Sequence, residues 1–202
     1  MGLITDVFDR RNRIWFGGHC YRTRPAYDIV LAVQKLYKDP DLTELDKLEQ
    51  ALRMLIKNQT RVRRLSQTQK ADLLTEIVKQ QIELPPRPQV GKQQKVVDFD
   101  LDGEYIYASF LQAYGMDLLE EQGRLQWKRF IALFQGLPDG TKIREIMKIR
   151  GMDIPSPTKQ NQKERQNLME LKAYYALPVE GGGGQKGLNA LFSVLESQAK
   201  GR

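Results

Sequence analysis

The order of apolar and polar residues near the N-terminus predicts a short β-hairpin. Two β-prone runs, Ile14-Trp15-Phe16 and His19-Cys20-Tyr21, flank the pair Gly17-Gly18. A two-residue Gly-Gly link suits the tight primed turns, because glycine readily adopts the positive φ angles that those turns need. We therefore expect the two runs to pair as antiparallel strands.

Beyond this hairpin, the apolar positions recur at helical spacing. Three stretches between residues 26 and 82 each carry an apolar face. Thr43 and Ser66 are the expected N-caps of the second and third helices, because Asp46 and Gln69 follow them by three residues, as in a capping box. The predicted apolar positions are Ile29, Val30, Val33, Leu36, Tyr37, Leu45, Leu48, Leu52, Leu55, Ile56, Leu73 or Leu74, Ile77, Val78 and Ile82.

Residues 84–96 are expected to form a linker, because their three prolines, one glycine and polar residues favour no regular element. Further helices are predicted after the linker. Their apolar faces are Tyr107, Phe110, Leu111, Tyr114 and Leu118; then Trp127, Phe130, Ile131 and Phe134; then Ile143, Ile146 and Met147; then Leu168, Leu171 and Tyr175.

The C-terminal segment has a different character. Gly181–Gly184 predicts a flexible tether. An amphipathic stretch follows, with an apolar face of Leu188, Leu191, Phe192 and Leu195. A short helix of this kind is marginally stable alone, so it either folds back on the core or docks into a groove on a partner.

These patterns predict a mainly α protein, built of one or more small helical bundles with a short N-terminal β-hairpin. The expected organisation has four parts. They are 1–83, the hairpin plus three helices; 84–96, the proline-rich linker; 97–178, a C-terminal helical domain; and 179–202, the glycine-tethered amphipathic tail.

Composition narrows the chemistry. The chain has 202 residues, of which 41% are hydrophobic, and it contains one cysteine and one histidine. A disulfide framework and a zinc site made of several Cys and His ligands are therefore excluded within the chain. No Gly-rich phosphate loop or Ser-His-Asp motif is recognisable. We expect no enzyme activity, no cofactor, no metal, no signal peptide and no membrane segment.

The stretch Asp98-Phe-Asp-Leu-Asp102-Gly103 begins like a calcium-binding loop, with aspartates at alternate positions. The twelfth position of such a loop supplies a bidentate glutamate, and here it is Ser109. Apolar periodicity also starts inside the supposed loop, at Ile106. Carboxylates just before a helix accept hydrogen bonds from its free N–H groups, so we interpret the aspartates as a helix start.

A net charge of +7 raises the question of nucleic acid. The densest basic cluster is Arg61–Arg64, followed by Lys70. Aromatic residues fall mainly outside the basic segments, which favours a solvated helix end over nucleic-acid binding.

A longer pattern is more specific. Val97–Leu118 has the form V-D-F-D-x-D-x-E-x-I-Y-A-S-F-x-Q-x-Y-G-x-D-L, and LQWKRFIALFQGLP follows. These residues resemble a family of tail proteins from long-tailed phages of Gram-positive bacteria, labelled the gene product fifteen family. The resemblance is close over residues 97–150 and loose elsewhere. Its specificity rests on the tyrosine-rich helix, on Trp127-x-x-Phe130 and on Gly136-Leu137-Pro138.

The resemblance implies a tail assembly role in the host cytoplasm. In that family the gene typically lies between the tail-tube and tape-measure genes, as tail assembly chaperone genes do. Implied partners are the tape-measure protein and either a second copy or a shorter partner chaperone, and no catalytic residue is implied. Alternatives are a structural component of the virion tail and a basic nucleic-acid-binding accessory protein. Candidate partner-binding residues are Trp127, Phe130, Phe134, Leu188, Leu191, Phe192 and Leu195.

Overall fold

The structure is a computed structural model that describes residues 12–84 and 95–178. These residues form seven α-helices and one two-stranded hairpin, with short 3₁₀ and π-helical turns, so the predicted mainly α class is confirmed. Two compact units are present. Unit 1 contains the described residues 12–84 and 119–135, and unit 2 contains 95–118 and 136–178. In this part of the chain, no helix has the length and apolar character needed to cross a membrane.

The N-terminal hairpin of unit 1 forms as predicted. Strands β1 (Arg13–Phe16) and β2 (His19–Arg22) pair antiparallel, with Trp15 directly opposite Cys20. Gly17 and Gly18 have φ angles of 55° and 75°. Positive φ at both turn positions matches the right-handed twist of the strands, which explains the Gly-Gly sequence.

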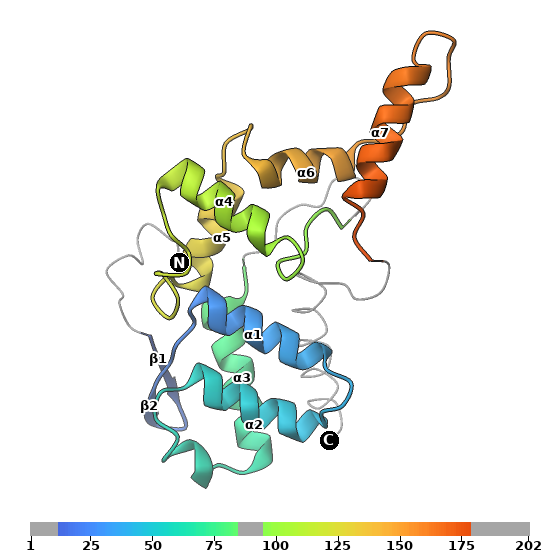
Figure 1. Cartoon of the computed structure of the whole chain (residues 1–202). Helices are drawn as coiled ribbons and strands as arrows, with labels where there is room; N and C mark the ends of the chain where they lie inside the picture. Colours follow the sequence, from blue (N-terminus) through green and yellow to red (C-terminus); the bar gives the residue numbers. More distant parts are fainter. Residues whose placement is uncertain (1–11, 85–94, 179–202) are drawn as a thin grey trace. The chain divides into compact units, whose positions relative to one another are not determined.

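Helices form the body of unit 1 (Figure 1). They are α1 (Tyr27–Lys38), α2 (Glu44–Leu55), the 3₁₀ turn η2 (Val62–Arg64), α3 (Gln67–Ile77), the π-helical turn η3 (Val78–Ile82) and α5 (Trp127–Gln135). The predicted caps are confirmed: the Thr43 hydroxyl accepts a hydrogen bond from the Asp46 N–H, and Ser66 and Gln69 form a capping box. α2 packs against both α1 and α3. The largest fully buried aliphatic side chains here are Ile14, Leu52, Leu55, Ile56, Leu73, Leu74, Ile77 and Ile82.

Helix α5 belongs to unit 1, whereas the sequence placed it in the C-terminal domain. The start of α5 and the start of α1 satisfy each other's free backbone groups. The Tyr27 N–H donates to the Leu125 carbonyl at 2.9 Å, and the Trp127 N–H donates to the Pro25 carbonyl at 2.8 Å. The rings of Tyr27 and Phe130 stack with centroids 4.8 Å apart. These contacts join residues about a hundred positions apart, which local periodicity does not reveal.

Unit 2 contains α4 (Gly103–Tyr114), α6 (Lys142–Gly151) and α7 (Gln162–Tyr174). α4 packs on α6, and α6 contacts α7. The buried face of α4 is Ile106, Ser109 and Phe110, and the predicted face residues Leu111 and Tyr114 are exposed. The Ser109 hydroxyl accepts a hydrogen bond from the Ile143 N–H at 3.1 Å, so it satisfies a free donor at the start of α6. Because of this hydrogen bond, the face of α4 that contacts α6 is the one that carries Ser109.

We predict that Phe130→Ala destabilises unit 1 by about 3–5 kcal/mol, because it removes a fully buried ring. Amide hydrogen exchange should then accelerate in α1, including at Tyr27. Leu45→Ala, at a half-exposed leucine of α2, is the control and should change little. Loss of protection confined to residues 95–118 and 136–178 would contradict the assignment of α5 to unit 1.

Candidate functional site

The aspartates before α4 build a turn and a helix start. One carboxylate oxygen of Asp98 accepts hydrogen bonds from the N–H groups of Asp100 and Leu101, at 3.0 and 3.2 Å. α4 begins directly after Asp102, which confirms the interpretation as a helix start. The Asp102 carboxylate, however, does not cap its own helix. It accepts instead from the Asp98 N–H at 2.9 Å and faces a guanidinium.

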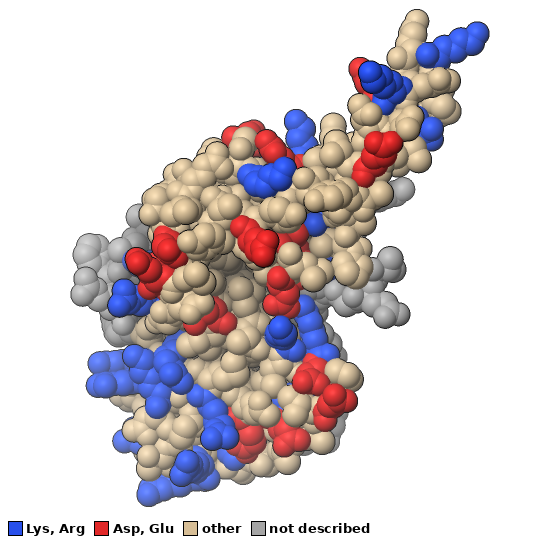
Figure 2. Space-filling model, viewed as in Figure 1, with Lys and Arg blue, Asp and Glu red and all other residues tan. Residues whose placement is uncertain are grey.

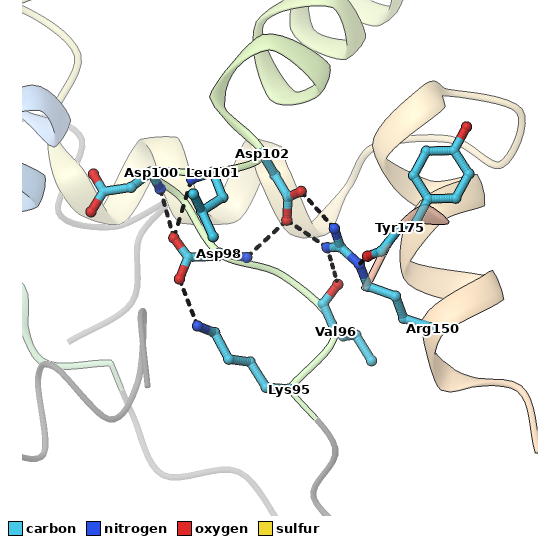
Figure 3. Close-up of polar contacts among 8 residues, drawn as sticks. All are labelled: Lys95, Val96, Asp98, Asp100, Leu101, Asp102, Arg150 and Tyr175. Carbon is cyan, nitrogen blue, oxygen red and sulfur yellow. Dashed lines mark hydrogen bonds and ion pairs between the residues drawn. The ribbon is translucent and has the colours of Figure 1, made fainter. Parts of the chain in front are cut away.

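That guanidinium belongs to Arg150, at the end of α6 (Figure 3). Arg150 Nη1 and Nη2 donate to the two carboxylate oxygens of Asp102, at 2.6 and 2.8 Å. Nη1 also donates to the Val96 carbonyl at 3.0 Å, and Nε donates to the Tyr175 carbonyl at 2.6 Å. The side chains of Arg150 and Asp102 are 8% and 2% exposed. A planar guanidinium suits this arrangement, because it offers a fixed fork of donors.

Arg150 was not predicted from sequence as part of a site. A usable signal was present, because Arg150 follows Ile143 and Ile146 by seven and four residues and so continues their buried face. A charged residue on an apolar face indicates a buried partner. Val96, which was assigned to the linker, is held by this cluster.

Lys95 extends the cluster toward solvent. Its ammonium contacts the second carboxylate oxygen of Asp98 at 2.6 Å. Burial alone raises the pKa of the Asp98 carboxyl, but the hydrogen bonds from Lys95 and from the N–H groups of Leu101 and Asp100 outweigh burial and lower it. Asp98 is therefore held in its charged form.

Helix α7 is attached to this cluster by its C-terminal end. Lys172 Nζ donates to the carbonyls of Ile149, Arg150 and Met152, at 3.2, 2.7 and 2.7 Å. These carbonyls lie at the end of α6, where backbone acceptors lack helical partners and the dipole favours a cation. The Tyr175 ring meets the Tyr105 ring edge-on, with centroids 6.2 Å apart. Arg150 and Lys172 thus tie α4, α6 and α7 together.

The rest of α7 is open. No residue of the helix is buried. Met169 and Leu171 are each 44% exposed, and Tyr174 is 77% exposed. Figure 1 shows α7 meeting α6 near the C-terminal ends of both helices. A thirteen-residue helix is marginally stable without packing. An uncovered helix with three large apolar side chains is a candidate surface for a protein partner.

The partner-binding residues predicted from sequence lie elsewhere. Trp127, Phe130 and Phe134 are buried in unit 1, and each neighbouring pair is stacked. They form part of a core and offer no open face. Leu188, Leu191, Phe192 and Leu195 lie outside the described residues. α7 was predicted as a helix, but its open side was not, because exposure depends on what the other helices cover.

No metal site is visible in the described ranges 12–84 and 95–178: no group of three or more His, Cys, Asp or Glu side chains there has the geometry to hold an ion. The charged groups of Lys95, Asp98, Asp102 and Arg150 form hydrogen bonds to helix ends and to one another. The arrangement positions helices.

We predict that Arg150→Met destabilises unit 2 by about 3–5 kcal/mol, because the buried Asp102 carboxylate loses its counter-charge. Arg150→Lys keeps the charge but not the fork, so it should also destabilise. The double variant R150M/D102N should be more stable than R150M, since no unpaired buried charge remains. Urea denaturation followed by circular dichroism measures these differences. Equal stability of R150M and the parent chain would contradict the role of the cluster.

The lowered pKa of Asp98 predicts that the stability of unit 2 depends on pH in the acid range. The folded pKa of this carboxyl lies below the ordinary value of 3.8, so the stabilisation from its charged form is complete above that pH. It declines as the pH falls through the lowered pKa of the folded state. We expect the stability difference between the parent chain and Asp98→Asn to shrink in that acid range, whereas an exposed control, Asp153→Asn, should give no such trend. A pH-independent difference would contradict this assignment.

Comparison with known protein families gives a match that covers most of the chain. The family model described as bacteriophage Gp15 protein matches residues 11–177, which is most of the chain. No match is found among the curated proteins or the solved structures. The matched range includes both units and extends well beyond residues 97–150, where the resemblance was closest. The chain therefore belongs to the bacteriophage Gp15 protein family.

Proposed function

We propose that this phage protein is a non-enzymatic tail assembly chaperone, which acts in the host cytoplasm and binds the tape-measure protein. Family membership supports a phage role. The gene position typical of the family, between the tail-tube and tape-measure genes, supports the assembly role. The observation that carries the proposal is the uncovered α7, with Met169, Leu171 and Tyr174 exposed.

A tape-measure chaperone has to bind its client and release it again. Its client is long and helical, and must stay soluble until the tube forms around it. A helix with exposed apolar side chains can pair with an apolar stripe of such a client. Fully covering one large side chain contributes roughly 1.5–3 kcal/mol. Leu171 and Tyr174 are three residues apart on one face of α7, so a client helix can cover both of them and gain a binding energy suited to reversible capture.

The attachment of α7 fits the same role. Lys172 and Tyr175 fix the C-terminal end of the helix to α6 through hydrogen bonds. The exposed residues 169, 171 and 174 lie in the same C-terminal half. A helix anchored at one end loses less conformational entropy when it binds than a free helix does. Leu188, Leu191, Phe192 and Leu195, which lie outside the described residues, are a second candidate contact in this proposal, because their spacing predicts an apolar face.

The test is co-expression of the chain with the tape-measure protein encoded beside it, followed by pull-down of soluble complex. We expect the parent chain to retain the client and L171E/Y174E to lose most of it. A truncation after Val179 should retain less client than the parent chain, because it removes the second candidate contact at residues 188–195. The matched control is L45E/L101E, which places two glutamates on leucines that are 50% and 58% exposed elsewhere.

Retention by L171E/Y174E equal to that of the control would remove α7 from the contact. Failure of the parent chain to retain any client would contradict the chaperone role itself. The composition of purified virions then becomes informative, because a structural tail component is present there in fixed stoichiometry and a chaperone is absent.

A further inference from the structure

Unit 1 carries a basic pocket that the proposed function does not use. Its volume is about 480 Å³, and it is lined by Cys20, Tyr21, Arg22, Lys57, Asn58, Thr60, Arg61 and Arg64. Four of these side chains are cationic and none is acidic. Figure 2 shows Lys and Arg gathered at the lower left, where Figure 1 places the hairpin and the connection between α2 and α3.

The fold builds this pocket from two distant segments. The chain after β2 pairs with the end of α2: the Arg24 N–H donates to the Leu55 carbonyl at 2.7 Å, and the Lys57 N–H donates to the Arg22 carbonyl at 2.9 Å. Arg61 Nη1 reaches back to the Cys20 carbonyl at 3.4 Å. These bonds place Arg22 beside the basic run that follows α2.

The cations that line the pocket are not paired with acidic side chains of the described residues. Within the part of the chain that the structure describes, Arg22, Lys57, Arg61 and Arg64 have no carboxylate partner. Arg13 stands directly across the hairpin from Arg22. Two like charges at opposed strand positions destabilise a hairpin, and a bound anion relieves that repulsion. A cluster of four cations with no acidic lining residue attracts anions.

An exposed aromatic ring lies on β1, the strand paired with β2, and three residues of β2 line the pocket. Trp15 is 73% exposed, more than any other large apolar residue described except Tyr174. It pairs with Cys20, and opposed residues of an antiparallel pair lie on one face, so Trp15 shares a face with Cys20. Strand alternation puts Arg13 and Arg22 on that face as well. Cys20 and Arg22 line the pocket.

We propose that this surface binds single-stranded nucleic acid, with backbone phosphates in the basic pocket and a base stacked on Trp15. A sequence-tolerant single-strand site has two parts. Cationic side chains contact the phosphates of the nucleic-acid backbone, and an aromatic ring stacks on a base. An acidic peptide would use the cations but leaves the exposed indole without a role. A duplex keeps its bases stacked on each other and leaves Trp15 unused. The sequence favoured a solvated helix end, because aromatic residues fall mainly outside the basic segments. In the fold, β2 pairs with the strand that carries Trp15 and is contacted by Arg61.

The experiment is a fluorescence-anisotropy titration of the full chain with labelled oligo-dT and oligo-U of about 12 nucleotides, at several salt concentrations. We expect log affinity to fall linearly with log salt, with a slope of about −0.7 per phosphate contacted. R61Q/R64Q should weaken binding and make that slope shallower by about 1.4. Trp15→Ala should weaken binding by about tenfold with little change in slope. The matched control K159Q/K163Q removes two exposed cations from unit 2 and should leave both quantities unchanged.

Several results would overturn the proposal. One is no binding by the parent chain at low salt; another is equal loss in the control and in R61Q/R64Q. Competition by polyglutamate as effective as by oligo-dT would show a general anion site. Tighter binding of a duplex than of either single strand would remove the stacking role of Trp15. Binding of oligo-dT, of oligo-U or of both by the parent chain, with the variant pattern above, supports the proposal and identifies the type of strand.

Discussion

The buried pair of Asp102 and Arg150 is the interaction on which unit 2 depends. Its guanidinium reaches the start of α4, the segment before that helix and the residue after α7. Few apolar side chains are fully buried in this unit, Phe110, Ile143 and Ile146 among them. A core of that size leaves helix ends to be fixed by polar contacts. A buried ion pair adds little to the net free energy of unfolding, but its directional hydrogen bonds specify which helix ends meet.

Helix-end chemistry recurs around this pair. Ser109 of α4 satisfies a free N–H at the start of α6, and Lys172 of α7 satisfies free carbonyls at its end. α6 is therefore capped at both ends by its neighbours in space. Because Lys172 and Tyr175 are used in this way, the C-terminal end of α7 is held firmly, while Leu171 and Tyr174 remain open. The same contacts that complete unit 2 thus present the surface that we propose for the client.

Local features were predictable from sequence and long-range ones were not. The Gly17-Gly18 turn and the caps at Thr43 and Ser66 depend on residues within a few positions of each other, and all are confirmed. The position of α5 in unit 1 depends on the contact between Tyr27 and Phe130, which no local pattern encodes. In the candidate site, Asp102 was identified as a helix start, but its partner Arg150 lies 48 residues away.

Local sequence patterns also do not show which apolar or charged side chains are exposed. Trp127, Phe130 and Phe134 have the spacing of an apolar stripe, and spacing alone does not distinguish a core face from a docking face. They are buried, whereas Leu171 and Tyr174 of α7 are exposed. Trp15 and the Arg61–Arg64 run are far apart in sequence, and both flank β2, which pairs with β1 and bonds to the segment after α2. Tertiary contacts decide which side chains are available to a partner.

The most direct test of the chaperone account is amide hydrogen exchange of the chain, alone and in complex with the tape-measure protein. In the free chain, residues 162–174 should exchange faster than the other α-helices, because none of them is buried. Binding of the client should slow exchange in this range most strongly. A complex in which residues 162–174 remain unprotected, with protection gained elsewhere, would contradict the assignment of α7 as the contact surface.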